Sequence, residues 1–484
     1  MPTRGNLVET KGRKVIVFGL ARSGAGAANL LSLMGSEVTV TDRKPAADLE
    51  GYIRRLSPDV RLRLGGYPEG LDGTDLIVAS PGVPLTIEPL VKARGKGIKI
   101  IGEFELAYRL MSSNLSTDLG APKFLAVTGT NGKSTTTTLL DRMLRKGGSG
   151  TLFGGNIGNA LTEEIVKKVE AKAENRQDLD LNLDFVVAEV SSFQLETIDK
   201  FRPFGASILN ITPDHLDRYD SMSDYIDAKC RIFENQGQDD FLVLNADDPV
   251  TPEIARRMGR QGAKGKEMPR IYYFSRRHKV KGAFLRDGAV SFSLPGVPDS
   301  FALQTQSFRI KGVHNLENAM ASAVMALLAG CPPSSVQEAL AEFPGLEHRL
   351  EFVRELDGVR YINDSKGTNV GAVMKSLEGF SERVVLIAGG RDKAGDFKPL
   401  RPLVKEKVRT LVLIGEAAAK MRDSLGELTE TLLAADLKEA VDIARKSAGK
   451  GDIVLLSPAC ASFDMFKDYE DRGRQFKEIV GGLS

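Results

Sequence analysis

The stretch that decides the fold reads TGTNGKST, residues 128–135. An apolar run, 124–127, precedes it, and a helical pattern, 136–146, follows it. A strand, a glycine-rich loop and a helix in this order are typical of a phosphate-binding loop. Gly129 and Gly132 allow backbone N–H groups to turn toward an anion, and the start of the helix adds the positive end of its dipole.

The loop carries the side chains that nucleotide chemistry needs. Lys133 can reach the outer phosphates of ATP, and the Ser134 hydroxyl can coordinate Mg²⁺. The general phosphate-loop pattern has glycine where this chain has Val127. The alternative is a glycine-rich turn with a surface lysine, but the strand, the loop, the Lys-Ser pair and the helix together favour phosphate binding.

Composition places the chain in a broad class. A length of 484 residues predicts about three domains. The net charge of +2 gives no reason to expect nucleic acid or an anionic membrane as a partner. The three cysteines form no CxxC pair, so neither a disulfide framework nor a cysteine-based zinc site is predicted. Residues 1–13 are polar and no apolar run approaches the length of a membrane span, so we expect a cytoplasmic protein.

Strand and helix patterns alternate through three blocks, which predicts an α/β protein with parallel sheets. A polar segment at 112–122 predicts a linker. Residues 270–310 alternate apolar and polar side chains between turn residues, which predicts antiparallel strands. We therefore expect domains at 1–118, 119–344 and 345–484. The other expected strands are 14–19, 37–41, 76–82, 124–127, 185–189, 206–210, 241–245, 359–363, 384–388, 410–414 and 452–456.

Several of these strands end in polar residues, and ligands bind at the carboxyl ends of strands in open α/β sheets. The turn 19–24, followed by Asp42, is similar to a dinucleotide fingerprint, although Ala21 replaces its middle glycine. A structural turn, NAD binding and binding of another nucleotide all remain open for it. Asp42 and Arg43 could hold a ribose or a base.

Glu189 ends an apolar strand, where its carboxylate can reach a Mg²⁺ held by Ser134. The alternative is an acidic residue at a strand edge, but a carboxylate after four apolar residues needs a partner. Three of the four histidines lie in polar clusters, at 214–218, 314–318 and 347–349. Each cluster taken alone is as consistent with a structural role as with a functional one.

Two motifs of the third block carry charged side chains at strand ends. In the motif 362–369, Asp364 could accept ribose hydroxyls and Lys366 could meet a phosphate or a carboxylate. The segment 389–393 ends the next strand and offers another cation. Cys460 has no histidine near it in sequence, so a small buried thiol is a better interpretation than a nucleophile.

Taken in order, these motifs resemble the Mur ligases, the ATP-dependent amide-forming enzymes of peptidoglycan precursor synthesis. The resemblance covers nearly the whole chain. It implies an N-terminal Rossmann-like domain for a UDP-sugar, a central P-loop ATPase domain with a parallel sheet plus a small antiparallel sheet, and a C-terminal Rossmann-like domain for an amino acid. The motifs are TGTNGKST at 128–135, EVSSFQLE at 189–196, DHLDRY at 214–219, HNLEN at 314–318, HRLE at 348–351 and NDSKGTN at 363–369.

The resemblance also implies cofactors, ATP and two Mg²⁺ ions, and roles for single residues. Ser134 and Glu189 would hold one Mg²⁺, and His215 would help to hold the second. Lys229 would be carbamylated, because an anionic carbamate suits a divalent cation and a bare ammonium does not. The catalytic residues would be Lys133, Glu189, His215 and Lys229. The ATP site would comprise Gly129, Thr130, Asn131, Gly132, Lys133, Ser134, Thr135, Asn318, Arg349, Asp364 and Lys366.

Within the family, the chain is most similar to members that add D-glutamate to UDP-N-acetylmuramoyl-L-alanine. The motifs that indicate this are GLARSG at 19–24, GGNIG at 154–158 and SPACASFDMFKDYEDRG at 457–473. Arg22 and Ala21 depart from the expected glycine-rich turn, and residues 1–13 have no implied role. The UDP-sugar would contact Ser23, Asp42, Arg43, Gly82 and Asn156. D-glutamate would contact Thr368, Lys393, Ser462, Phe463 and Tyr469.

The implied reaction transfers the γ-phosphoryl group of ATP to the substrate carboxylate, and the amine of D-glutamate then displaces phosphate. We expect a monomer with these small-molecule substrates and no nucleic-acid or membrane partner. The alternatives within the class are another Mur-type amide ligase and a folylpolyglutamate synthase-like ligase. An NAD-dependent dehydrogenase would leave the phosphate loop unexplained. A motor or transport ATPase would leave the lysine-bearing motifs of the third block unexplained.

Overall fold

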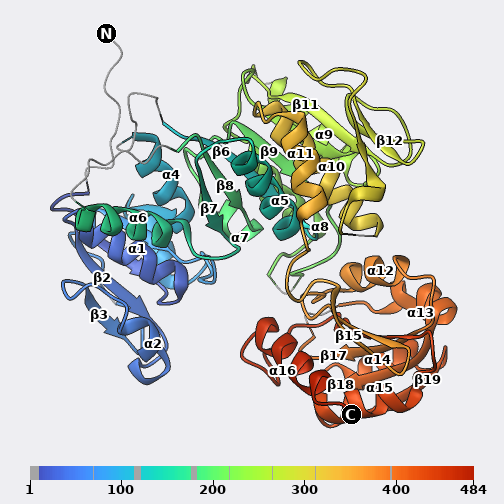
Figure 1. The fold of residues 1–484 in the computed structure, drawn as a ribbon. Helices are drawn as coiled ribbons and strands as arrows, with labels where there is room; N and C mark the ends of the chain where they lie inside the picture. Colours follow the sequence, from blue (N-terminus) through green and yellow to red (C-terminus); the bar gives the residue numbers. More distant parts are fainter. Residues whose placement is uncertain are drawn as a thin grey trace.

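The chain folds around three sheets that follow one another in sequence. Figure 1 shows them as a blue, a green-to-yellow and an orange-to-red body. The predicted α/β class with three domains is confirmed by this arrangement. The computed structural model describes residues 10–68, 70–113, 121–175, 183–216, 218–263, 265–310, 312–392 and 395–484.

The first sheet is parallel, with the strand order β3-β2-β1-β4-β5. Its helix α4 continues to Ser113, so the chain is still helical where the sequence predicted the start of a linker. Residues 114–120 of that segment lie outside the described residues. The strands are β1 Lys14–Phe18, β2 Glu37–Asp42, β3 Arg61–Leu64, β4 Leu76–Ala79 and β5 Lys99–Gly102. The helices are α1 Arg22–Leu33, η1 Ala46–Leu49, α2 Glu50–Ile53, α3 Glu88–Gly95 and α4 Glu103–Ser113.

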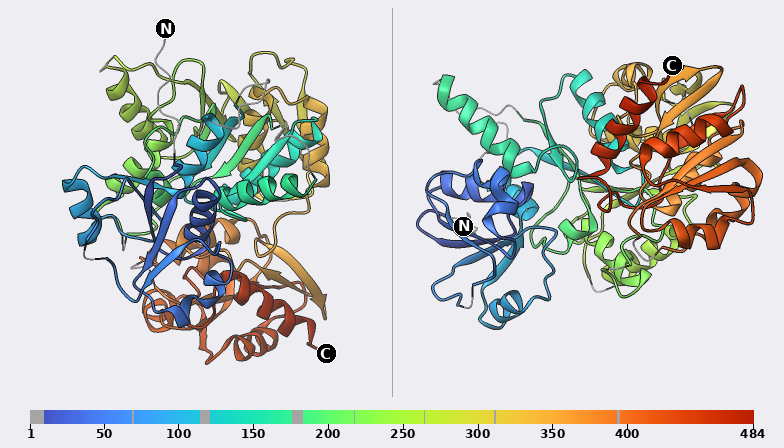
Figure 2. Two further views of the ribbon diagram at one scale, coloured as in Figure 1. Left: turned by 90° about the vertical axis from the view of Figure 1, so that its left-hand side faces the viewer. Right: turned by 90° about the horizontal axis from the view of Figure 1, so that it is seen from below.

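Helix α6, Leu161–Asn175, belongs to the middle block in sequence but packs against α1 and α4 of the first. Figures 1 and 2 show it beside the blue helix α1. Its start is held by the buried carboxylate of Glu103, whose Oε1 accepts hydrogen bonds from Thr162 N at 2.9 Å and Thr162 Oγ1 at 2.8 Å. The chain therefore crosses back to the first sheet before it completes the second.

The second sheet has the order β14-β13-β12-β11-β10-β9-β6-β8-β7. The antiparallel strands predicted within 270–310 extend this sheet and form no sheet of their own, and β11 pairs in parallel with β10 and β12. The strands are β6 Lys123–Thr128, β7 Thr151–Gly155, β8 Phe185–Glu189, β9 Gly205–Ile208, β10 Phe241–Asn245, β11 Arg270–Ser275, β12 Gly282–Arg286, β13 Ala289–Phe292 and β14 Ala302–Gln304. The helices besides α6 are α5 Lys133–Lys146, α7 Ser192–Leu195, α8 Met222–Cys230, η2 Arg231–Phe233, α9 Thr251–Gly262, η3 Thr305–Ser307, α10 Val313–Leu328 and α11 Pro333–Glu342.

The third sheet has the order β15-β16-β20-β17-β18-β19, and only β15 runs antiparallel to its neighbour. The sequence did not predict the two edge strands. The strands are β15 Glu351–Leu356, β16 Val359–Asn363, β17 Val384–Gly389, β18 Val408–Ile414, β19 Glu430–Leu433 and β20 Ile453–Leu456. The helices are α12 Val370–Glu378, η4 Lys398–Leu400, α13 Arg401–Lys407, α14 Ala418–Leu425, α15 Leu437–Ser447 and α16 Tyr469–Gly481.

The first two sheets share one apolar core, in which Phe104 of α4 packs edge-on against Phe201 with ring centroids 4.8 Å apart. The third sheet has its own cores on its two faces. The carboxyl ends of its strands meet those of the second sheet across a cavity of about 670 Å³. We propose the predicted divisions at 118/119 and 344/345 as domain boundaries, because both fall between sheets.

Candidate active site

The phosphate loop joins β6 to α5, and both of its central glycines are required by their surroundings. Gly129 has φ of 146° and Gly132 has φ of 84°, which is backbone that other residues rarely adopt. A Cβ atom on Gly132 would lie 2.2 Å from Asn318 Oδ1. The loop is also tied to the next strand, because Thr130 N donates to the carbonyl oxygen of Asn210 at 2.9 Å. The helix begins at Lys133, three residues earlier than predicted, since the left-handed Gly132 serves as its N-cap.

Two lysines donate to one carbonyl oxygen of this loop. Lys133 Nζ lies 2.9 Å from Gly129 O and 2.8 Å from Thr130 O, and Lys229 Nζ lies 2.9 Å from the same Gly129 O. Lys229 is only 2% exposed. Burial, reinforced by the charge of Lys133, holds the pKa of Lys229 well below its ordinary value. The amine at residue 229 is therefore easily deprotonated, and an anion between the two lysines would relieve their repulsion.

Glu189 ends β8, which pairs with β6, so its carboxylate lies beside the phosphate loop. Its Oε1 accepts a hydrogen bond from Asn156 Nδ2 at 2.6 Å. Burial alone would raise the pKa of Glu189, but the charges of Lys133 and Lys366 outweigh it and the pKa is lowered. The second oxygen, Oε2, is buried and accepts no hydrogen bond from the described residues, although the Ser134 hydroxyl is close enough to stabilise its charge.

This donor set fits a divalent cation. Mg²⁺ prefers oxygen ligands, and the buried Oε2 of Glu189 beside the Ser134 hydroxyl supplies two at the loop that would hold phosphate. His215 lies across the same cavity and has φ of 56°, and its Nε2 is 3.5 Å from Asp214 Oδ2. Lys229 fits such a site only after it gains an anionic group.

Arg349 reaches across from the third domain to the phosphate loop, and its Nη2 donates to Ser134 Oγ at 2.9 Å. The residues on either side of it, His348 and Leu350, have φ of 63° and 45°. Left-handed backbone of this kind costs free energy and persists only where the surroundings hold it. The loop that carries Arg349 is therefore held in one conformation by contacts from its own domain.

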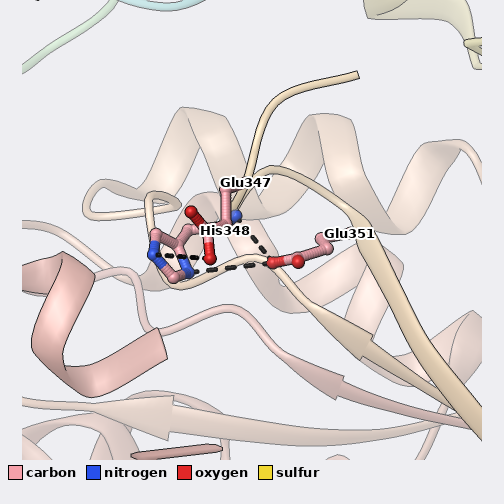
Figure 3. Close-up of side chains that lie close together, drawn as sticks. All are labelled: Glu347, His348 and Glu351. Carbon is pink, nitrogen blue, oxygen red and sulfur yellow. Dashed lines mark hydrogen bonds and ion pairs between the residues drawn. The ribbon is translucent and has the colours of Figure 1, made fainter. Parts of the chain in front are cut away.

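Figure 3 shows His348 with the two glutamates that it contacts, Glu347 and Glu351. Glu351 accepts hydrogen bonds from His348 N at 2.9 Å and from Asn363 Nδ2 at 3.0 Å. Lys477 Nζ bonds to Glu347 and Glu351, so an ammonium group already neutralises the two carboxylates. The cluster is thus an anchor for the loop, and a metal ion there would have to displace Lys477.

Asp364 and Lys366 follow β16 at the third domain's side of the cavity. Asp364 is 6% exposed and accepts hydrogen bonds from Ser376 Oγ at 2.8 Å and Ser457 Oγ at 2.7 Å. Burial raises its pKa to about 6 in spite of these bonds. Burial and the neighbouring Arg349 lower the pKa of Lys366 to about 7. The ammonium of Lys366 stacks on the ring of Tyr469, with Nζ 3.5 Å from the centroid.

Most residues that the sequence singled out line this one cavity. Sequence reasoning missed Asn369, whose Nδ2 lies 3.2 Å from Asn131 Oδ1 and 3.4 Å from Asp214 Oδ2, although the motif NDSKGTN ends on it. Asp214 was likewise visible only as part of the His215 motif. The expected residues that line the cavity are Thr130, Asn131, Gly132, Lys133, Thr135, Asn156, Glu189, His215, Lys229, Asn318, Arg349, Asp364, Lys366, Thr368 and Phe463.

The other expected UDP-sugar residues lie at the carboxyl edge of the first sheet and do not line the cavity. Asp42 Oδ2 accepts a hydrogen bond from Leu20 N at 2.7 Å, so it shapes the glycine-rich turn. Arg22 of that turn donates to Gly158 O, and Arg218 donates to Pro81 O at 3.1 Å, next to Gly82. These bonds connect the edge of the first sheet to the second domain. The expected residues in this group are Ser23, Asp42, Arg43 and Gly82.

The expected D-glutamate residues come from three loops of the third domain. Thr368 and Phe463 line the cavity, Ser462 is buried next to Phe463, and Tyr469 lies under Lys366. Lys393 lies outside the described residues. Cys460 is buried, as predicted. Among the helices that the structure describes, none combines the length and the apolar character that crossing a membrane requires.

Comparison with known proteins gives matches along almost the whole chain. Three family models match: "Mur ligase MurD-like, N-terminal domain" at residues 13–102, "Mur ligase middle domain" at 127–326 and "Mur ligase, glutamate ligase domain" at 348–460. A UDP-N-acetylmuramoylalanine--D-glutamate ligase from Citrifermentans bemidjiense is 47% identical over 476 residues, 98% of each chain. A protein of the same name from Pelotomaculum thermopropionicum is 45% identical over 476 residues, 97% of this chain and 98% of its own.

Solved structures show a similar fold at low sequence identity. A UDP-N-acetylmuramate-alanine ligase from Thermotoga maritima is 20% identical, with a TM-score of 0.58 over 97% of this chain and 99% of its own. MurF from Acinetobacter baumannii is 16% identical, with a TM-score of 0.59 over 97% of this chain and 92% of its own. At these identities the likeness concerns the fold alone.

Proposed function

This chain belongs to the Mur ligase family, and we propose that it joins D-glutamate to UDP-N-acetylmuramoyl-L-alanine at the expense of ATP in peptidoglycan precursor synthesis. The observation that carries the proposal is the single cavity in which a phosphate loop meets the strand ends of a second α/β domain. Such a cavity brings a nucleotide and two further substrates together, which is what an ATP-dependent ligase requires.

The first chemical step activates a carboxylate. A carboxylate is a poor acyl donor because oxide would have to leave, whereas an acyl phosphate has a good leaving group. Lys133 is placed to bind the phosphoryl group that is transferred. Its ammonium would first have to turn from the carbonyl oxygens of Gly129 and Thr130 to the nucleotide. Arg349 and Lys366 add positive charge from the opposite wall of the cavity.

We propose two Mg²⁺ sites in this cavity, one held by Ser134 and Glu189 and the other by His215 with a carbamylated Lys229. Mg²⁺, when bound, neutralises charge on phosphate oxygens. The low pKa of Lys229 supports the modification, because only a neutral amine adds to CO₂, forming the carbamate and releasing a proton. The carbamate would replace one of two adjacent cations with an anion.

The second step forms the amide. The amine of D-glutamate attacks the acyl carbon, a tetrahedral intermediate forms, and phosphate leaves. We place D-glutamate against Thr368, Lys393, Ser462, Phe463 and Tyr469, where a cation and hydroxyl groups can face its two carboxylates. A site enclosed between the second and third domains would also keep water from the acyl phosphate.

We place the UDP group at the carboxyl edge of the first sheet, where Ser23, Asp42, Arg43 and Gly82 lie, with Asn156 on the path to the ATP site. The bond between Asn156 and Glu189 supports this path, because it links the expected sugar site directly to the proposed metal ligand. We further propose that the enzyme acts as a monomer in the cytoplasm on these small-molecule substrates.

The test is phosphate release from ATP by the purified protein, with each substrate omitted in turn. We expect release only when UDP-N-acetylmuramoyl-L-alanine and D-glutamate are both present. Release with a folate and L-glutamate, or with a different amino acid in place of D-glutamate, would assign the chain to another amide ligase. Release that needs neither substrate would contradict ligation.

A further inference from the structure

Arg472 of α16 is an arginine with no exposed surface at all. Its guanidinium donates only to neutral oxygens: Nε to Ser365 Oγ at 3.0 Å, Nη2 to Ser365 O at 2.9 Å and to Cys460 O at 3.3 Å, and Nη1 to Ala461 O at 3.4 Å. Within the described part of the chain no carboxylate lies within ion-pair distance of it. This is an unusual environment for a cation.

Such a placement is unfavourable by itself. A buried charge without an ionic partner pays a desolvation cost that hydrogen bonds to carbonyl oxygens offset only in part. Burial accordingly lowers the pKa of Arg472 to about 10, so it remains a cation at neutral pH. The carboxylates of Asp464 and Asp364 raise its pKa from beyond ion-pair distance, and an anion bound on the other side of the loops that cover it would add to this stabilisation.

The loops held by Arg472 are those that surround the third domain's side of the cavity. Ser365 lies in the loop after β16, one residue before Lys366 and three before Thr368, and Cys460 and Ala461 lie in the loop after β20, directly before Ser462. The hydroxyl of Ser365 also donates to the carbonyl oxygen of Tyr469 at 2.8 Å, which ties in the start of α16.

The loop after β17 joins the same arrangement. Arg391 N donates to Ala461 O at 2.9 Å, and Ala461 N donates to Arg391 O at 3.1 Å. A Cβ atom on Gly390 would lie 2.3 Å from Ala461 O and 3.3 Å from Arg472 Nη1, so only glycine fits there. Arg472 thus lies beneath the carboxyl ends of β16, β17 and β20 together.

We propose that Arg472 is a positioning residue for D-glutamate, which fixes these three loops and supplies positive potential beneath the two carboxylates of the amino acid. The inference rests on the proposed function, because it assumes that Thr368 and Ser462 face D-glutamate. The proposed ATP-binding residues Asp364 and Arg349 should depend less on Arg472. Asp364 has its own hydrogen bonds to Ser376 and Ser457, and Arg349 is held by the cluster around His348.

The experiment compares Arg472→Met and Arg472→Lys with a matched control, Arg354→Met. Arg354 Nη1 donates to the carbonyl oxygens of Val480, Gly481 and Leu483, each at 3.1 Å, so it holds the other end of the same helix α16. Both methionine variants remove a guanidinium that binds several backbone carbonyls. Only the variants at residue 472 disturb the three loops.

We expect Arg472→Met to raise the KM for D-glutamate about tenfold or more, as small displacements of substrate-positioning groups do, while the KM for ATP changes less than about twofold. Arg472→Lys keeps the positive charge but cannot make all the hydrogen bonds of the planar guanidinium. Its KM for D-glutamate should therefore lie between those of wild type and Arg472→Met. Arg354→Met should lower Tm and leave the KM for D-glutamate unchanged. If Arg472→Met yields no folded protein, Arg472→Lys is used alone, and its KM for D-glutamate should again be raised.

The inference is overturned if the folded variants at residue 472 keep the wild-type KM for D-glutamate, or if Arg354→Met raises it equally. Thr368→Val separates this failure from failure of the proposed site. A raised KM in Thr368→Val with a normal KM in the Arg472 variants rejects the role of Arg472 alone. A normal KM in both rejects the placement of D-glutamate at these loops and the inference with it.

Discussion

Replacing Asp364 with asparagine should make the ligand-free protein more stable at neutral pH, although the residue lies in the active site. The fold raises the pKa of this carboxyl group from its ordinary 3.8 to about 6. A carboxyl group whose pKa is raised by folding contributes stability that is fully present below pH 3.8 and is lost as the pH rises to about 6. Asparagine has the same shape and no charge, so it should avoid this loss.

The size of the effect follows from the shift. A difference of about two pH units, at 1.4 kcal/mol each, corresponds to about 3 kcal/mol above pH 6. Between about pH 4.5 and pH 7.5 the difference in the free energy of unfolding between Asp364→Asn and wild type should grow by about 2 kcal/mol in favour of the variant. For a domain of this size that is a change of roughly 4 to 8 °C in Tm. Activity should fall at the same time, because the carboxylate would no longer be available to ATP.

The assay is thermal unfolding of both ligand-free proteins across this pH range, followed by circular dichroism. The control is Asp357→Asn at the turn between β15 and β16, where the aspartate side chain is 75% exposed and its φ of 54° is one that asparagine tolerates. The pH-dependent gain of Asp364→Asn should exceed that of this control, because residue 364 is buried and residue 357 is exposed. If the Tm difference between Asp364→Asn and wild type stays constant with pH, or falls as the pH rises, the electrostatic reasoning is refuted.

Substitutions at three lysines test the site further. Lys133→Ala should lower ligation at least about a hundredfold while Tm stays within a few degrees, because two of its hydrogen bonds go to carbonyl oxygens of its own loop. Near-normal turnover would remove Lys133 from the phosphate site. Lys393→Ala should raise the KM for D-glutamate much more than that for ATP, and equal effects on both would place Lys393 elsewhere. Lys229→Ala should be inactive but partly rescued by acetate or formate at fixed ionic strength. Lys229→Arg should not be rescued, since its positive charge remains. Full activity of Lys229→Ala without additive would make the carbamate unnecessary.

The sequence predicted those parts of the fold that have strong local signals. Apolar runs that end in glycine or a polar residue, such as Phe185–Glu189 and Phe241–Asn245, were identified with their observed bounds. The missed strands among the described residues all lie at sheet edges, and each has at most two consecutive large apolar side chains: Arg61–Leu64, Lys99–Gly102, Thr151–Gly155, Glu351–Leu356 and Glu430–Leu433. Edge strands form because a neighbour offers hydrogen bonds, which local composition does not reveal.

Residue types and motif order were enough to select most of the residues that line the cavity, but not their relations. Nothing in the sequence shows that Lys133 and Lys229, nearly a hundred residues apart, donate to the same oxygen of Gly129. The sequence also does not predict that α6 packs against the first domain, because the pattern of its apolar residues does not identify the helices that will cover them. Arg472 was read only as part of a motif, since burial of an arginine depends on the packing of four separate segments.

The central claim is that ligation passes through an acyl phosphate formed on UDP-N-acetylmuramoyl-L-alanine. The most direct measurement uses this substrate with ¹⁸O in both oxygens of its carboxylate, together with ATP and D-glutamate, and determines the mass of the phosphate that is released. An acyl phosphate predicts that each released phosphate carries one ¹⁸O atom and that the amide product retains the other. Phosphate without ¹⁸O, formed at the same rate as the amide, would contradict the account.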